Sequence, residues 1–200
     1  ARAKARGGLR VFIGKGSVAD ILVEVSILEK KQRINLSELS ADEIKKFLVD
    51  NNIGIDCSGF VYHILDSELR AQNKKKLSSQ LSFNPSHNFF RKILTRLRAV
   101  QNTNVLTLSQ EENSFGVKLK EIKPGDMIIM LGTGKNHDRD HVLLIDKVNY
   151  TMADCQVSTT EKQETQSLNY VHSFVWSKEG KYNHGIKQGK IIITDIDKDL

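Results

Sequence analysis

The chain has 200 residues, of which 39% are hydrophobic and 27% are charged, an ordinary balance for a globular protein with a buried core. Its two cysteines are too few for a disulfide scaffold and lack the C-x-x-C spacing of a structural zinc site. The net charge of +6 favours an anionic partner, such as nucleic acid, a phospholipid surface or an anionic cell wall. No apolar run is long enough to predict a membrane-spanning segment.

Residues 1–39 are expected to form a basic extension with one amphipathic helix, ahead of a domain that spans residues 40–200. The opening ARAKARGG is typical of a mobile tail and lacks the apolar segment of a signal peptide. Because the chain begins with Ala1, we interpret it as a fragment or a processed product. The apolar run LRVFIG, at residues 9–14, predicts a short strand. Helical spacing then predicts a helix within residues 16–31, whose apolar face holds Val18, Ile21, Leu22, Val25 and Leu28.

Two further helices are predicted in the next part of the chain. Ser40 and Glu43 have the spacing of a capping box and are followed by apolar residues at helical spacing. Asn51, Asn52 and Gly54 are expected to end this helix. Another helix should then run from Cys57 to about residue 70.

The segment between residues 71 and 120 is expected to contain little regular structure. Residues 71–86 are polar and predict a loop, whereas residues 87–100 predict a basic amphipathic helix. Its apolar stripe of Phe89, Ile93 and Leu97 is expected to pack into the core. Residues 101–120 predict irregular structure, with a weak strand near NVLTL.

From residue 123 onward, the sequence predicts short strands. They are DMIIML at 126–131, HVLLIDKV at 141–148, TMADCQVS at 151–158, LNYVHSFVW at 168–176 and KIIITDI at 190–196. EKQETQS, at 161–167, predicts a charged loop between two of them. Helices followed by strands indicate the α+β class, with the helices packed on an antiparallel sheet.

Cys57, in the stretch NIGIDCSGFVYHILD, is the leading candidate for a chemically active residue. A thiol at a helix N-terminus faces free backbone N–H groups and the positive end of the helix dipole, which favour the thiolate. Gly59 would let another backbone segment approach this first turn closely. From the local sequence alone, a small buried cysteine in the core remains an equal alternative.

A cysteine nucleophile needs a base, and His141 is the best placed of the six histidines because it opens a strand that reads as buried. His137 reads as a surface loop residue and His63 as lying too far along the helix of Cys57. His172, in the middle of a predicted strand, could orient the base, although taken alone its position favours a core histidine.

In this order, IDCSGFVYHIL, EIKPGDMIIM and HVLLIDKV resemble the motifs of the NlpC-type, papain-like cysteine peptidases of bacterial cell walls. The resemblance covers roughly residues 40–176 and implies a papain-like fold with the catalytic cysteine on a helix. It implies that Cys57 is the nucleophile, His141 the base and His172 the third catalytic residue. The gap between the two histidines is longer than is usual in the family, so the third residue could also be Asp154, Gln156 or Ser158. No tyrosine precedes Cys57, which leaves the usual side-chain donor of the oxyanion hole without a candidate.

The resemblance implies hydrolysis of amide bonds in the peptide stems of peptidoglycan through a thioester acyl-enzyme, without a metal or cofactor. It also implies an extracytoplasmic or cell-wall location, for which the chain carries no signal. Two alternatives stay open: an acyltransferase or transamidase on the same fold, and a non-catalytic module that binds wall fragments or nucleic acid. Nucleic acid is not expected as the partner, because no RNP, KH or zinc-finger pattern accompanies the basic charge.

Overall fold

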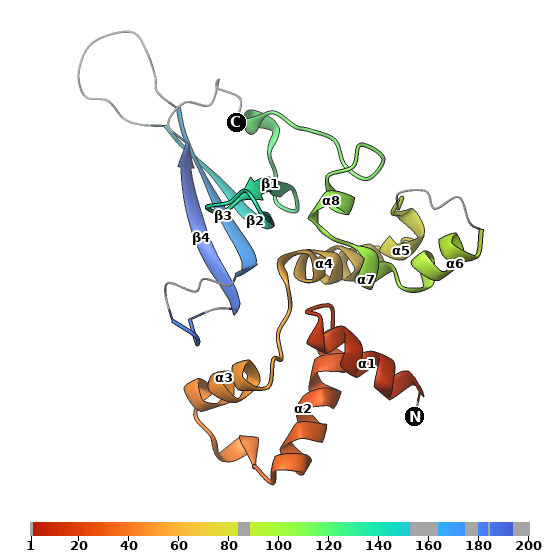
Figure 1. Cartoon of the computed structure of the whole chain (residues 1–200). Helices are drawn as coiled ribbons and strands as arrows, with labels where there is room; N and C mark the ends of the chain where they lie inside the picture. The colour runs from red at the N-terminus through yellow and green to blue at the C-terminus, as the bar shows by residue number, and fades with distance from the viewer. Residues whose placement is uncertain (1, 84–88, 153–163, 175–179, 184, 194–200) are drawn as a thin grey trace.

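The computed structural model describes residues 2–83, 89–152, 164–174, 180–183 and 185–193. Helices come first along the chain and a four-stranded antiparallel sheet follows, which confirms the predicted α+β class (Figure 1). The helices are α1 (Arg2–Phe12), α2 (Val18–Gln32), α3 (Ala41–Asp50), α4 (Cys57–Ala71), α5 (Leu77–Gln80), α6 (Phe89–Leu97), α7 (Ala99–Asn102) and α8 (Val105–Leu108), with the 3-10 turns η1 (Leu36–Glu38) and η2 (Leu119–Glu121). The strands are β1 (Met127–Thr133), β2 (Arg139–Met152), β3 (Glu164–Phe174) and β4 (Gly185–Ile193).

The N-terminal extension corrects the sequence prediction, because it contains two α-helices where one was expected. The predicted tail and strand together form α1, and the predicted helix is α2. Arg10 of α1 forms an ion pair with Asp20 of α2 at 2.6 Å, and Val11 is completely buried. These tertiary contacts outweigh the β-propensity of the run LRVFIG.

Helices α3 and α4 begin where the sequence predicts. The Ser40 side chain accepts a hydrogen bond from the backbone N–H of Glu43, and the Glu43 carboxylate accepts one from Ser40, which completes the capping box. Helix α4 starts at Cys57, with Asp56 as its N-cap residue accepting from the Gly59 N–H at 2.5 Å. In Figure 1, α4 lies beside the sheet and above α1 and α2.

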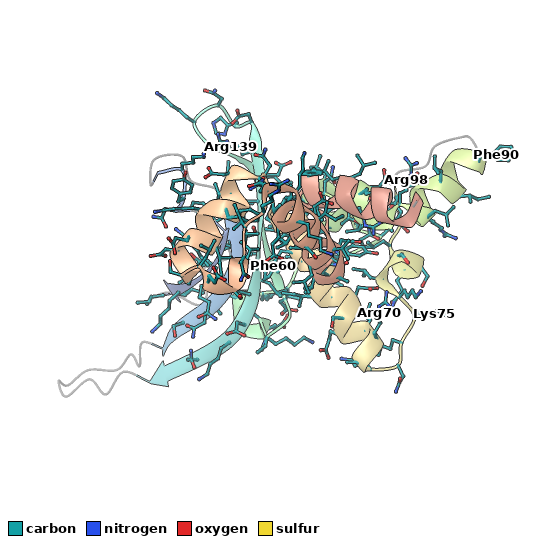
Figure 2. The ribbon with its side chains drawn as sticks, turned by 90° about the horizontal axis from the view of Figure 1, so that it is seen from below. Phe60, Arg70, Lys75, Phe90, Arg98 and Arg139 are labelled. Carbon is teal, nitrogen blue, oxygen red and sulfur yellow. The ribbon has the colours of Figure 1, made fainter. Side chains whose placement is uncertain are left out.

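The middle of the chain departs from prediction at three places. A short helix, α5, interrupts the predicted loop. The weak strand near NVLTL is helix α8, because the Asn104 side chain caps it at the Thr107 N–H. Two residues of the predicted apolar stripe of α6 do not pack into the core, since Ile93 is 44% exposed and Leu97 is 78% exposed. Figure 2 shows Phe90 at the outer end of α6 and Phe60 near the centre of the molecule.

The sheet is an antiparallel meander in the order β1-β2-β3-β4, and its two faces have separate cores. Alternation along each strand sends neighbouring side chains to opposite faces. Val142 and Leu144 of β2 pack with Val61 of α4 on the first face. Ile145 and Leu168 pack with residues around η2 on the second face.

The strand boundaries also refine the sequence prediction. The predicted charged loop at 161–167 enters strand β3, which begins at Glu164. The predicted strand at 151–158 overlaps the end of β2 and otherwise lies outside the described residues. Within the described part of the chain, no helix is long and apolar enough to cross a membrane.

Candidate active site at the start of helix α4

Cys57 is the first residue of the 15-residue helix α4 and carries a free thiol that is partly buried. It packs beside the core cluster that joins α4 to β1, β2 and β3. The backbone N–H of Val142, the residue after His141, forms a hydrogen bond with the sulfur. The thiol therefore meets strand β2 next to the predicted base.

Burial raises the pKa of the Cys57 thiol above its usual value, which reverses the direction expected from the helix N-terminus. The charge of Asp56 raises the pKa further. Hydrogen bonds from the Val142 and Ser58 backbones lower it, as does the positive charge of Lys15, but these effects are smaller than desolvation. The thiol is therefore in its neutral form at neutral pH in the absence of substrate.

The structure brings the side chains of His141 and His172 together. The Nε2 atom of His141 is 2.7 Å from the Nδ1 atom of His172, and the two rings meet edge to face. The Phe174 ring stacks on the His172 ring and meets the His141 ring edge to face. Burial lowers the pKa of both histidines, and the neighbouring His141 and Lys187 lower that of His172 further. Both imidazoles are therefore neutral at neutral pH.

The described residues show no hydrogen bond between Cys57 and His141. Cys57 contacts strand β2 at Val142, whose side chain packs toward α4. Because neighbouring side chains of a strand point to opposite faces, the His141 ring is turned away from α4. The structure thus brings the two histidines together with Tyr170 and Phe174, whereas Cys57 packs with Val142 and Val171 on the α4 face of the sheet.

Two hydrogen bonds hold the loop that leads into α4. The hydroxyl of Ser173, the residue after His172, donates a hydrogen bond to the Ile55 carbonyl oxygen. The N–H of Asp56 donates to the Gly14 carbonyl oxygen at 2.9 Å. Strand β3 and the turn between α1 and α2 therefore hold the segment before Cys57 from two sides.

Sequence reasoning missed Lys15, a buried residue in the turn between α1 and α2. Its Nζ atom contacts the Asp56 carboxylate at 2.9 Å and the Ser58 hydroxyl at 2.5 Å. The triplet Gly14-Lys15-Gly16 between two helices signals a tight turn, but nothing in it indicates that the lysine is buried. The predicted close approach at Gly59 is confirmed, because a Cβ atom there would lie 2.6 Å from the Gly14 carbonyl oxygen.

Two other histidines lie among the described residues. The Nε2 atom of His63 lies 3.1 Å from the Lys15 carbonyl oxygen, and His137 is bonded to the Gly132 carbonyl oxygen in an exposed hairpin loop. Among the described residues, no group of three or more His, Cys, Asp and Glu side chains could hold a metal ion. The remaining histidines and the alternative third residues lie outside the described part of the chain; they are His87, His184, Asp154, Gln156 and Ser158, together with Cys155.

Comparisons with protein-family models, with curated proteins and with solved structures found no match for this chain.

Proposed function

We propose that this protein is a papain-like cysteine hydrolase that cleaves amide bonds in peptidoglycan stem peptides through a thioester acyl-enzyme. The observation that carries the proposal is the 2.7 Å contact between His141 Nε2 and His172 Nδ1, on a sheet whose residue Val142, next to His141, contacts a free cysteine at a helix N-terminus. If His141 Nε2–H donates to His172, the Nδ1 atom of His141 holds the lone pair that a general base needs.

The reaction starts from a neutral thiol and a neutral imidazole, in keeping with the raised pKa of Cys57 and the lowered pKa of His141. In the proposed reaction, substrate binding moves the His141 ring from its contact with His172 toward Cys57, where its Nδ1 atom takes the thiol proton. The sulfur attacks the amide carbonyl, and the C–N bond breaks as His141 returns the proton to the leaving amine. Water then adds to the thioester carbonyl and gives a proton to His141. The C–S bond breaks as His141 returns that proton to the sulfur, which releases the carboxylic acid and regenerates the thiol.

The first turn of α4 can stabilise the negative charge that develops on the carbonyl oxygen. The first N–H groups of a helix have no acceptor within the helix, and they carry the positive end of its dipole. Asp56 accepts from the Gly59 N–H and so fixes the orientation of this turn. Backbone donors of this kind typically contribute about 10²- to 10³-fold in rate.

The experiment is a digest of purified peptidoglycan that measures the release of new amino termini. Cys57→Ala should abolish release, and His141→Ala should reduce it strongly. His137→Ala is the matched control, because His137 lies in the exposed loop and should retain the wild-type rate. Absence of new amino termini with the wild-type protein, or full activity in Cys57→Ala, would contradict the proposal. Transfer of the acyl group to an added amine would favour the transamidase alternative.

A further inference from the structure

Lys15 is unusual for a lysine, because only 6% of its surface is exposed. Its ammonium group has three acceptors: the Asp56 carboxylate at 2.9 Å, the Ser58 hydroxyl at 2.5 Å and the Thr103 carbonyl oxygen at 2.7 Å. These acceptors use all three of its N–H donors. The buried charge is therefore fully hydrogen-bonded, which the cost of desolvating an ammonium group requires.

The backbone of Lys15 is also held at both ends. Its N–H donates to the Arg10 carbonyl oxygen at 2.7 Å, and its own carbonyl oxygen lies 3.1 Å from Nε2 of His63 on α4. Thr103, which accepts from the ammonium group, is itself completely buried. Lys15 thus connects the turn between α1 and α2, the first two turns of α4 and the segment after α7.

The contacts of Lys15 are concentrated on the two residues that flank Cys57. Asp56 is the N-cap residue, and Ser58 follows the cysteine in the first turn. The positive charge of Lys15 acts on the thiol and favours its ionised form. Asp56, on the same turn, acts on the thiol in the opposite direction. On the strands packed against this turn, the titratable residues are His141, next to Val142 of β2, and His172, next to Ser173 of β3.

We propose that Lys15 is a positioning residue for the Cys57 nucleophile: it fixes the N-terminal turn of α4 through Asp56 and Ser58 and supplies a buried positive charge that stabilises the thiolate. A role of Lys15 in catalysis rests on the proposed function. Its effect on the chemical reactivity of Cys57 can be measured without any substrate of the enzyme.

The test is the rate of Cys57 alkylation by iodoacetamide between pH 5 and pH 10, with peptide mass analysis to separate Cys57 from Cys155. Lys15→Met removes the charge with little change in side-chain length, and Lys15→Gln keeps an amide donor for the same acceptors. Lys181→Met is the matched control, since Lys181 is an exposed lysine in an ion pair with Asp50. Thermal unfolding of each variant establishes that the folded protein is being measured.

We expect both Lys15 variants to shift the pH profile of Cys57 upward and to lower its alkylation rate at pH 8 by about three- to tenfold, since each pKa unit changes the thiolate fraction tenfold. Lys15→Arg, which retains the charge, should stay closer to the wild-type profile. A merely structural role predicts the opposite sign, because a loosened turn would expose Cys57, relieve its desolvation and speed alkylation. Faster alkylation, or a profile identical to that of wild type, overturns the proposal. Hydrolysis of peptidoglycan is a separate readout, so either proposal can fail without the other.

Discussion

Replacing Gly59 by alanine tests the close contact between α4 and the turn that carries Lys15. In the interior of a helix, alanine is normally favoured over glycine by about 0.8–1.0 kcal/mol. At this position the added Cβ atom would lie 2.6 Å from the Gly14 carbonyl oxygen and 3.0 Å from Oδ1 of Asp56. The Gly14 oxygen belongs to the backbone and accepts the hydrogen bond from the Asp56 N–H, so it cannot move without weakening that bond.

The expected change in the free energy of unfolding follows from these opposing effects. Overpacking of this kind costs about 1–3 kcal/mol, and loss of one hydrogen bond costs about 1 kcal/mol. After the gain in helix propensity is subtracted, Gly59→Ala should reduce the free energy of unfolding by about 1–3 kcal/mol. For a chain of this size, that corresponds to a fall in Tm of roughly 2–12 °C.

The assay is thermal unfolding followed by circular dichroism, with Gly54→Ala as the control. Gly54 lies in the loop before α4, its φ angle is not positive, and a Cβ atom there would meet nothing within 4 Å. Gly54→Ala should therefore leave Tm unchanged or raise it slightly. A Tm for Gly59→Ala equal to or above that of wild type would refute the close packing of the two segments.

Three further predictions concern stability. Because burial lowers the pKa of His141 and His172 below the unfolded value of about 6.5, the unfolded chain binds protons first as pH falls. The free energy of unfolding should therefore decrease as pH falls below about 6.5, and it should decrease less steeply in His172→Asn. Urea unfolding at several pH values measures this dependence, and an equal slope against pH in wild type and variant would contradict the prediction. Ser40→Ala removes the capping box of α3 and should cost about 1 kcal/mol in urea unfolding, where no loss would argue against the cap. Leu168→Ala, at a completely buried position, should cost about 2–5 kcal/mol, and a loss below that range would contradict its place in the core.

Local sequence patterns were sufficient to predict the helices and strands that short-range interactions determine. The capping pair Ser40 and Glu43 predicted the start of α3, and short segments of strong β-propensity between turn residues predicted the strands. The prediction failed where contacts between residues distant in sequence determine the secondary structure. The LRVF run has the composition of a strand, yet it is helical because α1 packs on α2 through Arg10 and Asp20.

The candidate site shows the same division. Gly59 was expected to allow a close backbone approach, and it does, but nothing in the local sequence identifies its partner, Gly14, which lies 45 residues earlier (59 minus 14). The helix N-terminus predicted a lowered pKa for Cys57, whereas burial raises it, because desolvation depends on packing that the local sequence does not contain. Lys15 reads from the sequence as one more basic residue of the extension.

The central claim is that Cys57 forms a thioester with the acyl part of an amide substrate. Rapid acid quenching of the protein with a peptidoglycan stem peptide, followed by intact-mass and peptide analysis, tests this claim most directly. The account predicts an adduct on Cys57 with the mass of the acyl fragment, which hydroxylamine removes and which is absent from Cys57→Ala. New amino termini without any adduct on Cys57, or an adduct on another residue that persists in Cys57→Ala, would contradict it.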